Sequence, residues 1–462
     1  MNKSVIRVLL LISLLLIHLP LAAQTAEPKK LPDNVPGLLR TANNAYAAKD
    51  YVTFRDAMAA MNKMRPYNSD YMYQLVIAHA LLNEKTQAYD MMLRMQKSGL
   101  SYDFSLPEST ANIRGTEVFN YINDLMKMAG EPIGESEPAF VLPDTVVMPE
   151  TIRWDESRQK FLVGTIADGS ILAVGEDGQV EELLRADNEN GLWAILDMAI
   201  DQQQKRLWVS SASLPGFSAF DPVDKGRSAL YELNLETLEV INRYPVPVDG
   251  QAHILGSMAI DSKGDVYIVD RHLPIIYKKA AAEKKLKPVF ALRKMLSLRG
   301  MALQAEGHYM YVAGREMGIA VVEMATGRTG KLMTPETLNL GGIDGLYLKD
   351  NKLFVIQNGI KPQRVISLQL DPTGLKVTEI RPMAVAQPEF DYPSYGTLKG
   401  EDLYYFASSL WSGDTVPQEA VTVLRTSLNT AKEIIQPDMR LFLEQKAREQ
   451  AQKPAEKEQQ KD

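Results

Sequence analysis

The chain has 462 residues, no cysteine, and 58 acidic against 51 basic side chains, which gives a formal net charge of −7. The length allows two or three domains, and the lack of cysteine excludes disulfides and thiolate chemistry. The negative charge disfavours nucleic acid as a partner, because phosphate binding needs a basic surface. The five histidines lack metal-ligand spacing, which disfavours a histidine-rich zinc site.

Residues 1–23 have the pattern of a secretory signal peptide. Lys3 and Arg7 precede an apolar run, and the run ends in small residues that favour cleavage before Gln24. The run is too short for a membrane-spanning helix, and no lipobox cysteine follows it. We therefore expect a periplasmic or secreted protein with no transmembrane segment after cleavage. Residues 24–36 contain three prolines and are predicted to be a linker.

Residues 37–130 are predicted to form a helical domain, because apolar side chains recur at three-to-four spacing. Five helices are expected, at 38–48, 51–64, 69–82, 85–98 and 116–128. Asp50 and Ser69 occupy N-cap positions and Gly99 a C-cap position. The first four helices form two similar pairs at an offset of roughly 31–33 residues, near the tetratricopeptide period of about 34. The segment therefore resembles tetratricopeptide repeats.

Six methionines of this region stand at helical spacing and allow two interpretations. They could line an adaptable groove that binds a protein partner. Alternatively they fill the core between the helices, which is the commoner arrangement for a stripe on a helix. The residues are Met58, Met61, Met64, Met91, Met92 and Met95.

A strand–turn–strand unit recurs through residues 149–436 and indicates a six-bladed β-propeller. The clearest copy is SMAIDSKGDVYIVD at 257–270, in which a polar turn joins two apolar strands. Similar units begin near residues 151, 197, 300, 344 and 395, a period of roughly 40–60 residues. The predicted fold is thus a helical-repeat domain followed by an all-β propeller with four strands in each blade.

The flanks of the propeller carry two further predictions. Residues 131–148 are expected to connect the domains, and 140–142 to add a strand to the last blade and close the ring. Residues 437–462 are rich in charged residues and are predicted to be a disordered tail.

The innermost strand of each blade lines the central channel of a propeller, where function is normally sought. Aligning the units gives one residue from each blade at the entry to this channel. Three of the six are charged, whereas a position that only packs would be apolar or glycine. The six are Glu150, Leu196, Gly256, Arg299, Asp344 and roughly Ser394.

The segments PETIRW (149–154) and IDGL (343–346) resemble the senescence marker protein/gluconolactonase (regucalcin-like) family of six-bladed propellers. More distantly, the chain resembles NHL-type and strictosidine-synthase-like propellers. The first resemblance implies that Glu150 and Asp344 bind a divalent metal, often calcium. That family also uses an asparagine of the third blade for substrate and one of the fourth blade for metal. These positions are Gly256 and Arg299 in this chain.

Three interpretations of the channel remain open from the sequence. Glu150, Arg299 and Asp344 could form a structural ion-pair cluster, since arginine binds carboxylates through two hydrogen bonds. Arg299 could instead bind an anionic or polar ligand. In the third interpretation, a metal polarises a lactone or ester carbonyl and activates water, with Asp344 and Glu150 as catalytic residues. Calcium takes six to eight oxygen ligands. A nearby guanidinium argues against this last interpretation, because it would repel the cation and compete for the same carboxylates.

Two functions follow from these interpretations. The first is a binding or scaffolding protein that holds a protein partner on its helical domain or a small polar ligand in its channel. The second is a gluconolactonase-like, metal-dependent hydrolase.

Overall fold

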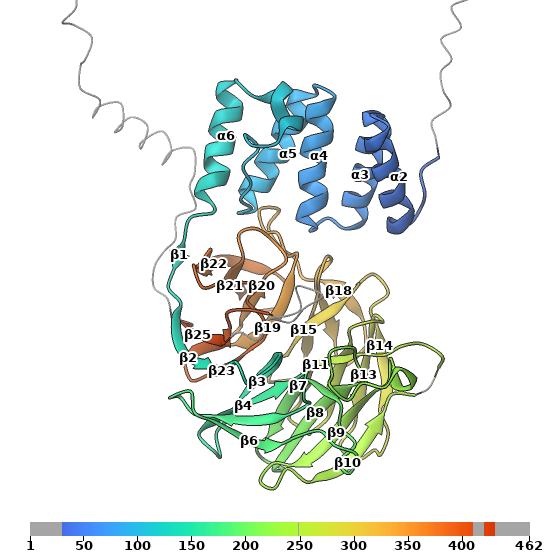
Figure 1. The fold of residues 1–462 in the computed structure, drawn as a ribbon, viewed down its shortest axis with the longest axis vertical. Coiled ribbons are helices and arrows are strands. Elements are labelled where there is room, and N and C mark those ends of the chain that lie inside the picture. Colours follow the sequence, from blue (N-terminus) through green and yellow to red (C-terminus); the bar gives the residue numbers. More distant parts are fainter. Residues whose placement is uncertain (1–29, 248, 410–419, 430–462) are drawn as a thin grey trace, which may run out of the picture.

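The computed structural model describes residues 30–247, 249–409 and 420–429. The predicted signal peptide and charged tail lie outside these ranges. A layer of helices lies against one side of a β-propeller, and the chain passes between them along β1 (Figure 1). No helix within the described ranges is long and apolar enough to cross a membrane.

Each predicted helix is present, and its ends lie within three residues of the prediction. Asp50 caps the second helix by accepting a hydrogen bond from the Thr53 backbone N–H. The third helix is capped by Asn68 rather than by Ser69, because the Asn68 side chain accepts from two backbone N–H groups of the first turn. The helices are α2 (Val35–Ala47), α3 (Tyr51–Met64), α4 (Ser69–Leu81), α5 (Lys85–Lys97), the 3₁₀ helix η1 (Glu108–Ile113) and α6 (Glu117–Met128).

Methionines fill much of the core between these helices. Met58, Met61, Met92 and Met95 are at most 4% exposed, whereas Met64 is 41% exposed. The core interpretation is therefore confirmed for four of the six methionines. The arrangement of the helix pairs is compatible with a tetratricopeptide-like repeat.

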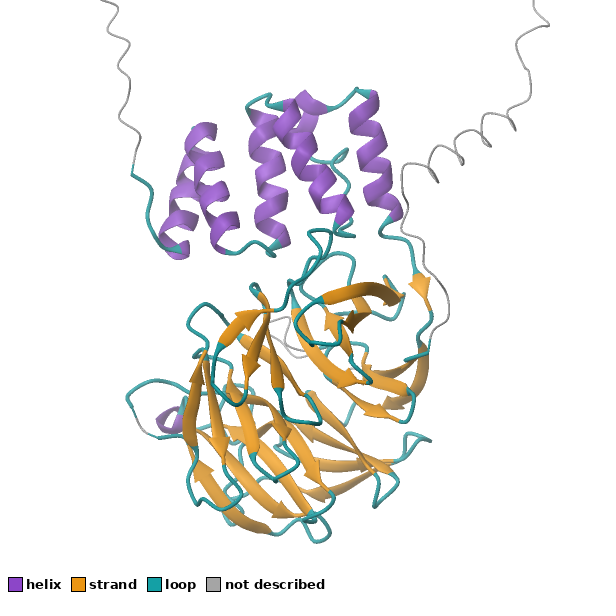
Figure 2. Cartoon of the chain, turned by 180° about the vertical axis from the view of Figure 1, so that it is seen from behind, coloured by secondary structure: helices purple, strands orange, loops and turns teal. Residues whose placement is uncertain are grey.

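Six antiparallel sheets form the blades of the propeller, and Figure 2 shows their strands from behind, below the row of helices. The first three blades consist of β3 (Pro149–Asp155), β4 (Lys160–Thr165), β5 (Ile171–Val174) and β6 (Val180–Leu184); β7 (Ala194–Asp201), β8 (Arg206–Ala212), β9 (Ser228–Asn234) and β10 (Val240–Pro245); and β11 (Leu255–Ile260), β12 (Val266–Asp270), β13 (Ile275–Lys279) and β14 (Lys287–Ala291). The short 3₁₀ helix η2 (Pro222–Asp224) lies in the connection between β8 and β9.

The other three blades complete the predicted six-bladed propeller. They consist of β15 (Leu298–Leu303), β16 (Tyr309–Gly314), β17 (Gly318–Glu323) and β18 (Thr329–Lys331); β19 (Ile343–Lys349), β20 (Lys352–Gln357), β21 (Arg364–Leu370) and β22 (Val377–Val385); and β23 (Gly396–Lys399), β24 (Asp402–Phe406), β25 (Val421–Ser427) and β2 (Glu137–Leu142).

The ring is closed by a strand that precedes the first blade in sequence. β2 pairs with β25 as the outermost strand of the sixth blade, so the prediction for 140–142 is confirmed. One more strand, β1 (Ile133–Gly134), pairs with β22 and extends the fifth blade to five strands. Pairing across the two ends of the propeller hides an edge and holds the ring closed.

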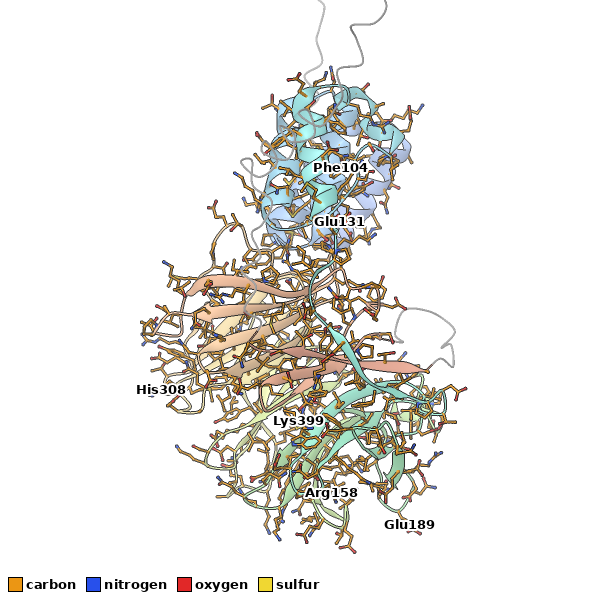
Figure 3. The ribbon with its side chains drawn as sticks, turned by 90° about the vertical axis from the view of Figure 1, so that its left-hand side faces the viewer. Phe104, Glu131, Arg158, Glu189, His308 and Lys399 are labelled. Atoms are coloured by element: carbon orange, nitrogen blue, oxygen red, sulfur yellow. The ribbon has the colours of Figure 1, made fainter. Side chains whose placement is uncertain are left out.

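The helical region and the propeller share buried side chains. Ile360, from the loop after β20, is 3% exposed and packs in the core of the helical region. Tyr67, between α3 and α4, packs in the reverse direction against the core of the fourth and fifth blades. In the side view of Figure 3, Phe104 lies within the helical region and Glu131 at its junction with the propeller.

Candidate functional site

The strand register shows why the sequence alignment found a common channel position. The innermost strands pair with their neighbours at Trp154–Phe161, Ile200–Leu207, Ile260–Val266, Leu303–Met310, Leu348–Leu353 and Leu398–Leu403. In the first five blades the register shifts four residues or so earlier, which leaves Glu150, Leu196, Gly256, Arg299 and Asp344 within a β-bulge. A β-bulge changes the direction of a side chain. The recurring bulge therefore gives these five positions a common geometry where the channel opens.

A cavity of about 700 Å³ occupies this end of the channel. It contains all three charged residues of the sequence prediction, Glu150, Arg299 and Asp344. In the sixth blade Tyr395 lines the cavity in place of the neighbouring Ser394. The remaining lining residues are Leu214, Ile254, Arg271, His272, Ser297, Arg315, Asn358, Tyr392 and Ser409.

Glu150 pairs with Arg271 rather than with Arg299. The Arg271 Nη1 atom lies 2.7 Å from the Glu150 carboxylate, and the two side chains are 7% and 5% exposed. The guanidinium also lies over the Tyr395 ring, 5.1 Å from its centroid. A Cβ atom on Gly256 would lie 2.6 Å from the Arg271 Nε atom. Gly256 thus contributes no ligand group, but its missing side chain makes room for Arg271.

Asp344 is shared by three groups. It accepts hydrogen bonds from Arg315 at 2.9 Å and from the Asn358 amide at 2.5 Å. Arg299 lies further away, with its Nε atom 3.8 Å from the same carboxylate. The predicted three-residue cluster therefore exists as two separate groups, around Glu150 and around Asp344. Three guanidinium groups face two carboxylates in the cavity.

Buried polar atoms without hydrogen bonds concentrate in the walls of this cavity. Eight such side-chain atoms occur in the described part of the chain, and four belong to residues that line it. They are Arg271 Nε, Arg299 Nε, Asn358 Oδ1 and the Tyr395 hydroxyl. Burial raises the pKa of the Tyr395 hydroxyl to about 12, so it stays protonated at neutral pH. An unpaired buried polar group costs about 1–3 kcal/mol, which marks this wall as suited to a polar ligand.

Arg271, Arg315 and Asn358 were missed from the sequence, although a second repeat position identifies them. Each stands five residues after the second-strand residue of the register given above, which is Val266, Met310 and Leu353 respectively. The corresponding residues of the other blades are Ile166, Ala212 and Ser408. The aligned second strands would therefore have revealed a second set of channel residues.

The donor groups do not fit a divalent cation. No group of three or more histidine and acidic side chains gathers among the described residues. Glu150 and Asp344, which the resemblance assigns to metal, are each paired with an arginine. Calcium needs six to eight oxygens, and three guanidinium groups would repel it. No reaction step through a metal follows from this arrangement.

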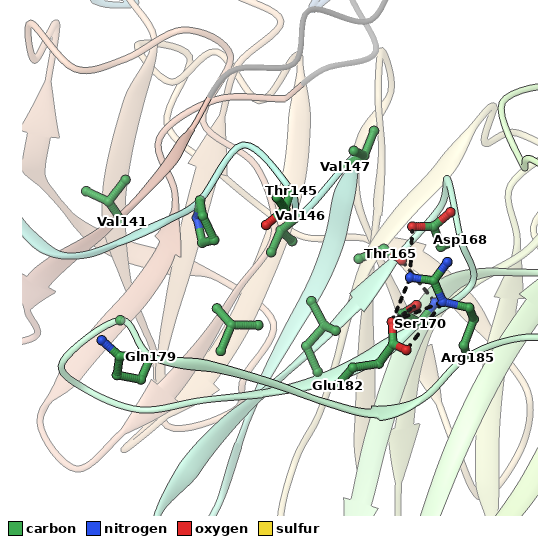
Figure 4. A pocket seen from close by; sticks show the side chains of 14 residues that line it. Val141, Thr145, Val146, Val147, Thr165, Asp168, Ser170, Gln179, Glu182 and Arg185 are labelled. Carbon is green, nitrogen blue, oxygen red and sulfur yellow. Dashed lines mark hydrogen bonds and ion pairs between the residues drawn. The ribbon is translucent and has the colours of Figure 1, made fainter.

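A second cavity, of about 570 Å³, lies beside the first blade and is shown in Figure 4. Arg185 points there between Asp168 and Glu182, at 3.6 and 2.9 Å. Arg185 is 56% exposed, and none of the eight unpaired buried atoms belongs to the cavity lining. Its charges are paired at the surface, so the channel cavity is the better site candidate.

No protein-family model and no curated protein matches the chain in sequence. Solved structures share the propeller fold. A gluconolactonase from Xanthomonas campestris is 14% identical, with 62% of this chain and 88% of that chain covered and a TM-score of 0.43. The PQQ-bound aldose sugar dehydrogenase from Streptomyces coelicolor is 10% identical, with 64% of this chain and 98% of that chain covered and a TM-score of 0.44.

Another similar structure is virginiamycin B lyase from Staphylococcus aureus. It is 12% identical, with 64% of this chain and 99% of that chain covered and a TM-score of 0.42. These likenesses concern the fold and carry no argument about function.

Proposed function

We propose that this protein is a binding protein whose propeller channel takes a small anionic ligand. The observation that carries the proposal is the charge balance of the channel cavity, where the described lining residues include three guanidinium groups, of Arg271, Arg299 and Arg315, and two carboxylates, of Glu150 and Asp344. The ligand would supply the missing negative charge. Arginine forks bind carboxylates and phosphates through paired charge-assisted hydrogen bonds.

The three arginines would have different roles. Arg271 is committed to Glu150 and is nearly fully buried. Arg299 and Arg315 compete for the single carboxylate of Asp344, and their side chains are 25% and 34% exposed. These two guanidinium groups are therefore the ones that can turn to an entering anion. The side-chain Oδ1 atom of Asn358 adds a hydrogen-bond acceptor, which favours a ligand with a hydroxyl or amine group beside its anionic group.

The location and the role of the helical region belong to the same proposal. The signal-peptide pattern of residues 1–23 supports a periplasmic or secreted protein. The helical region, which resembles tetratricopeptide repeats, is the proposed surface for a protein partner.

A titration with small anions tests the anion site. Inorganic phosphate, acetate and citrate would be added to the purified protein at constant ionic strength, and binding would be measured by calorimetry and by the melting temperature. A ligand at a hundred times its Kd stabilises the folded state by about 2.7 kcal/mol. Arg299→Gln should raise the Kd about tenfold, because a charged hydrogen bond contributes about 1.5–3 kcal/mol.

The matched control is Arg381→Gln, because Arg381 is 52% exposed on β22 and, among the described residues, forms an ion pair with the exposed Glu379 alone. This variant should bind the anions as the wild type does. The proposal fails if none of the three anions binds, or if Arg299→Gln binds them equally well.

The second candidate is the gluconolactonase-like hydrolase, which the shared cavity of Glu150 and Asp344 favours. It requires that a divalent cation displace Arg271 and Arg315 from these carboxylates. A rise in melting temperature with calcium, zinc or manganese, lost in Asp344→Asn, would support it over the anion site.

A further inference from the structure

The loop that follows β16 carries neighbouring side chains that point in opposite directions. Arg315 lines the channel cavity and donates to Asp344 at 2.9 Å. Glu316 contacts the helical region, where it pairs with Arg65 at 2.6 Å and accepts from the Asn68 amide at 2.8 Å. Arg65 and Glu316 are only 24% and 22% exposed, so water screens this pair incompletely.

The loop that follows β20 repeats this arrangement. Asn358 lines the cavity and donates to Asp344. Two residues later, Ile360 is 3% exposed in the core of the helical region. The next carbonyl, that of Lys361, accepts a hydrogen bond of 2.8 Å from the Ser101 backbone N–H. Both cavity loops are thus fixed from the outside by helical residues.

A glycine pair connects the two loops. The Gly342 N–H donates to the Arg315 carbonyl at 2.6 Å, and the Gly342 carbonyl accepts from the Asn358 N–H at 2.9 Å. Gly341 packs so closely on the helical region that a Cβ atom there would lie 2.2 Å from the Tyr67 carbonyl oxygen. Gly342 therefore joins the backbones of Arg315 and Asn358, and its neighbour Gly341 packs against Tyr67.

We propose that the helical region is a component of the ligand site, and that Glu316 and Tyr67 are positioning residues for Arg315 and Asn358. This inference rests on the proposed function in taking the channel as the ligand site. The two regions would then be coupled. A partner that shifts the segment 65–68 would change the affinity of the channel for its ligand, and the ligand would change the affinity for that partner by the same factor.

The inference is tested on the full chain with Glu316→Ala, using citrate and inorganic phosphate as the probes. Glu316 does not line the cavity, yet the variant should raise the Kd of the bound probe about fivefold or more. The charge-swapped pair Arg65→Glu with Glu316→Arg should restore at least half of the loss. Glu323→Ala is the matched control. Glu323 ends β17 of the same blade, and the variant removes its exposed ion pair with Arg328.

Hydrogen exchange separates this inference from the proposed function. In the absence of any anion, Glu316→Ala should speed amide exchange in the segments 339–345 and 358–361, and Glu323→Ala should not. If no anion binds the wild type, the proposed function fails, and the exchange alone decides whether Glu316 positions the loops. Unchanged exchange together with an unchanged Kd in Glu316→Ala would overturn the inference.

Discussion

Arg271 and Glu150 show how a charge balance is held at the scale of single residues. The carboxylate and the guanidinium lie 2.7 Å apart and are almost fully buried. Burying either charge alone would cost several kcal/mol, because the group would lose its hydration without gaining a partner. Loss of either member of the pair is therefore expected to destabilise the fold.

Removing one member of this pair is the first substitution to make. Arg271→Met should lower the free energy of unfolding by about 3–5 kcal/mol, since it removes a buried cation that lies 2.7 Å from the buried Glu150 carboxylate. The double variant Arg271→Met with Glu150→Leu should recover most of that loss. Urea denaturation of both variants measures the difference. A single variant as stable as the wild type would show that Glu150 does not depend on Arg271.

Gly256 gives a second prediction at this scale. Gly256→Ala would place a Cβ atom 2.6 Å from Arg271 Nε and 2.8 Å from its Cγ, so the arginine has to move. The expected cost is about 1–3 kcal/mol, as for overpacking elsewhere in protein cores, together with weaker anion binding. Gly330→Ala is the control, because no atom lies within 4 Å of a Cβ there. Equal stabilities of the two variants in thermal denaturation would refute the packing role of Gly256.

Three residues of the candidate site were predictable because they occupy equivalent positions in a repeat. Glu150, Arg299 and Asp344 share one register position on the inner strands, and a repeat makes such positions visible. Which carboxylate pairs with which arginine depends on side-chain directions across four blades, and no spacing encodes these directions. Arg271, which pairs with Glu150, stands instead at a repeat position of the second strands, so an alignment of the inner strands alone does not include it.

At the scale of elements, His253 joins the segment before β11 to the end of β12. Its Nδ1 atom lies 2.7 Å from Asp270 and its Nε2 atom 3.0 Å from Asp249. Burial lowers the pKa of His253, but the hydrogen bonds to Asp270 and Asp249 outweigh burial and raise it above its ordinary value. The imidazolium is therefore the form that the fold stabilises.

This geometry predicts a pH dependence of stability. A group with a raised pKa in the folded state contributes its full stabilisation below the unfolded value of about 6.5. The contribution is then lost as the pH rises through the folded pKa. Unfolding free energies measured from below to well above about pH 6.5 should fall on the alkaline side of that value, and Asp249→Asn should make the fall smaller, because it removes one of the two hydrogen bonds that raise the pKa of His253. His253→Gln removes the titrating group and should abolish this part of the profile.

Elements with a strong period were predictable, and short or locally determined features were not. The helices and the closing strand β2 carry clear apolar patterns. β1 has only two residues, Ile133 and Gly134, too few for any period. The cap of α4 was assigned to Ser69 instead of Asn68, because adjacent residues of both types favour the N-cap position.

At the scale of the whole molecule, Arg364 holds the two regions together. Its guanidinium donates to the carbonyls of Ser98 and Asn339 and to the Gln357 side chain, at 2.8–3.2 Å. No described carboxylate pairs with it. Ser98 is the C-cap of α5, and the carbonyls at a helix C-terminus carry partial negative charge. The helix end therefore stabilises a buried cation that belongs to the propeller.

This contact predicts that the helical region and the propeller unfold as one unit. Ile360, which is buried, and Tyr67, which is partly buried, cross the junction in opposite directions, so neither region keeps its full core alone. Calorimetry of the wild type should show one transition whose calorimetric and van't Hoff enthalpies agree. Arg364→Met should lower the melting temperature or split the transition, because the Ser98 carbonyl at the end of α5 loses its hydrogen bond to the cation. Arg381→Met, on the exposed face of β22, should do neither. Two transitions in the wild type would show that the junction is too weak to couple the regions, and the positioning role of Glu316 would then lose its structural support.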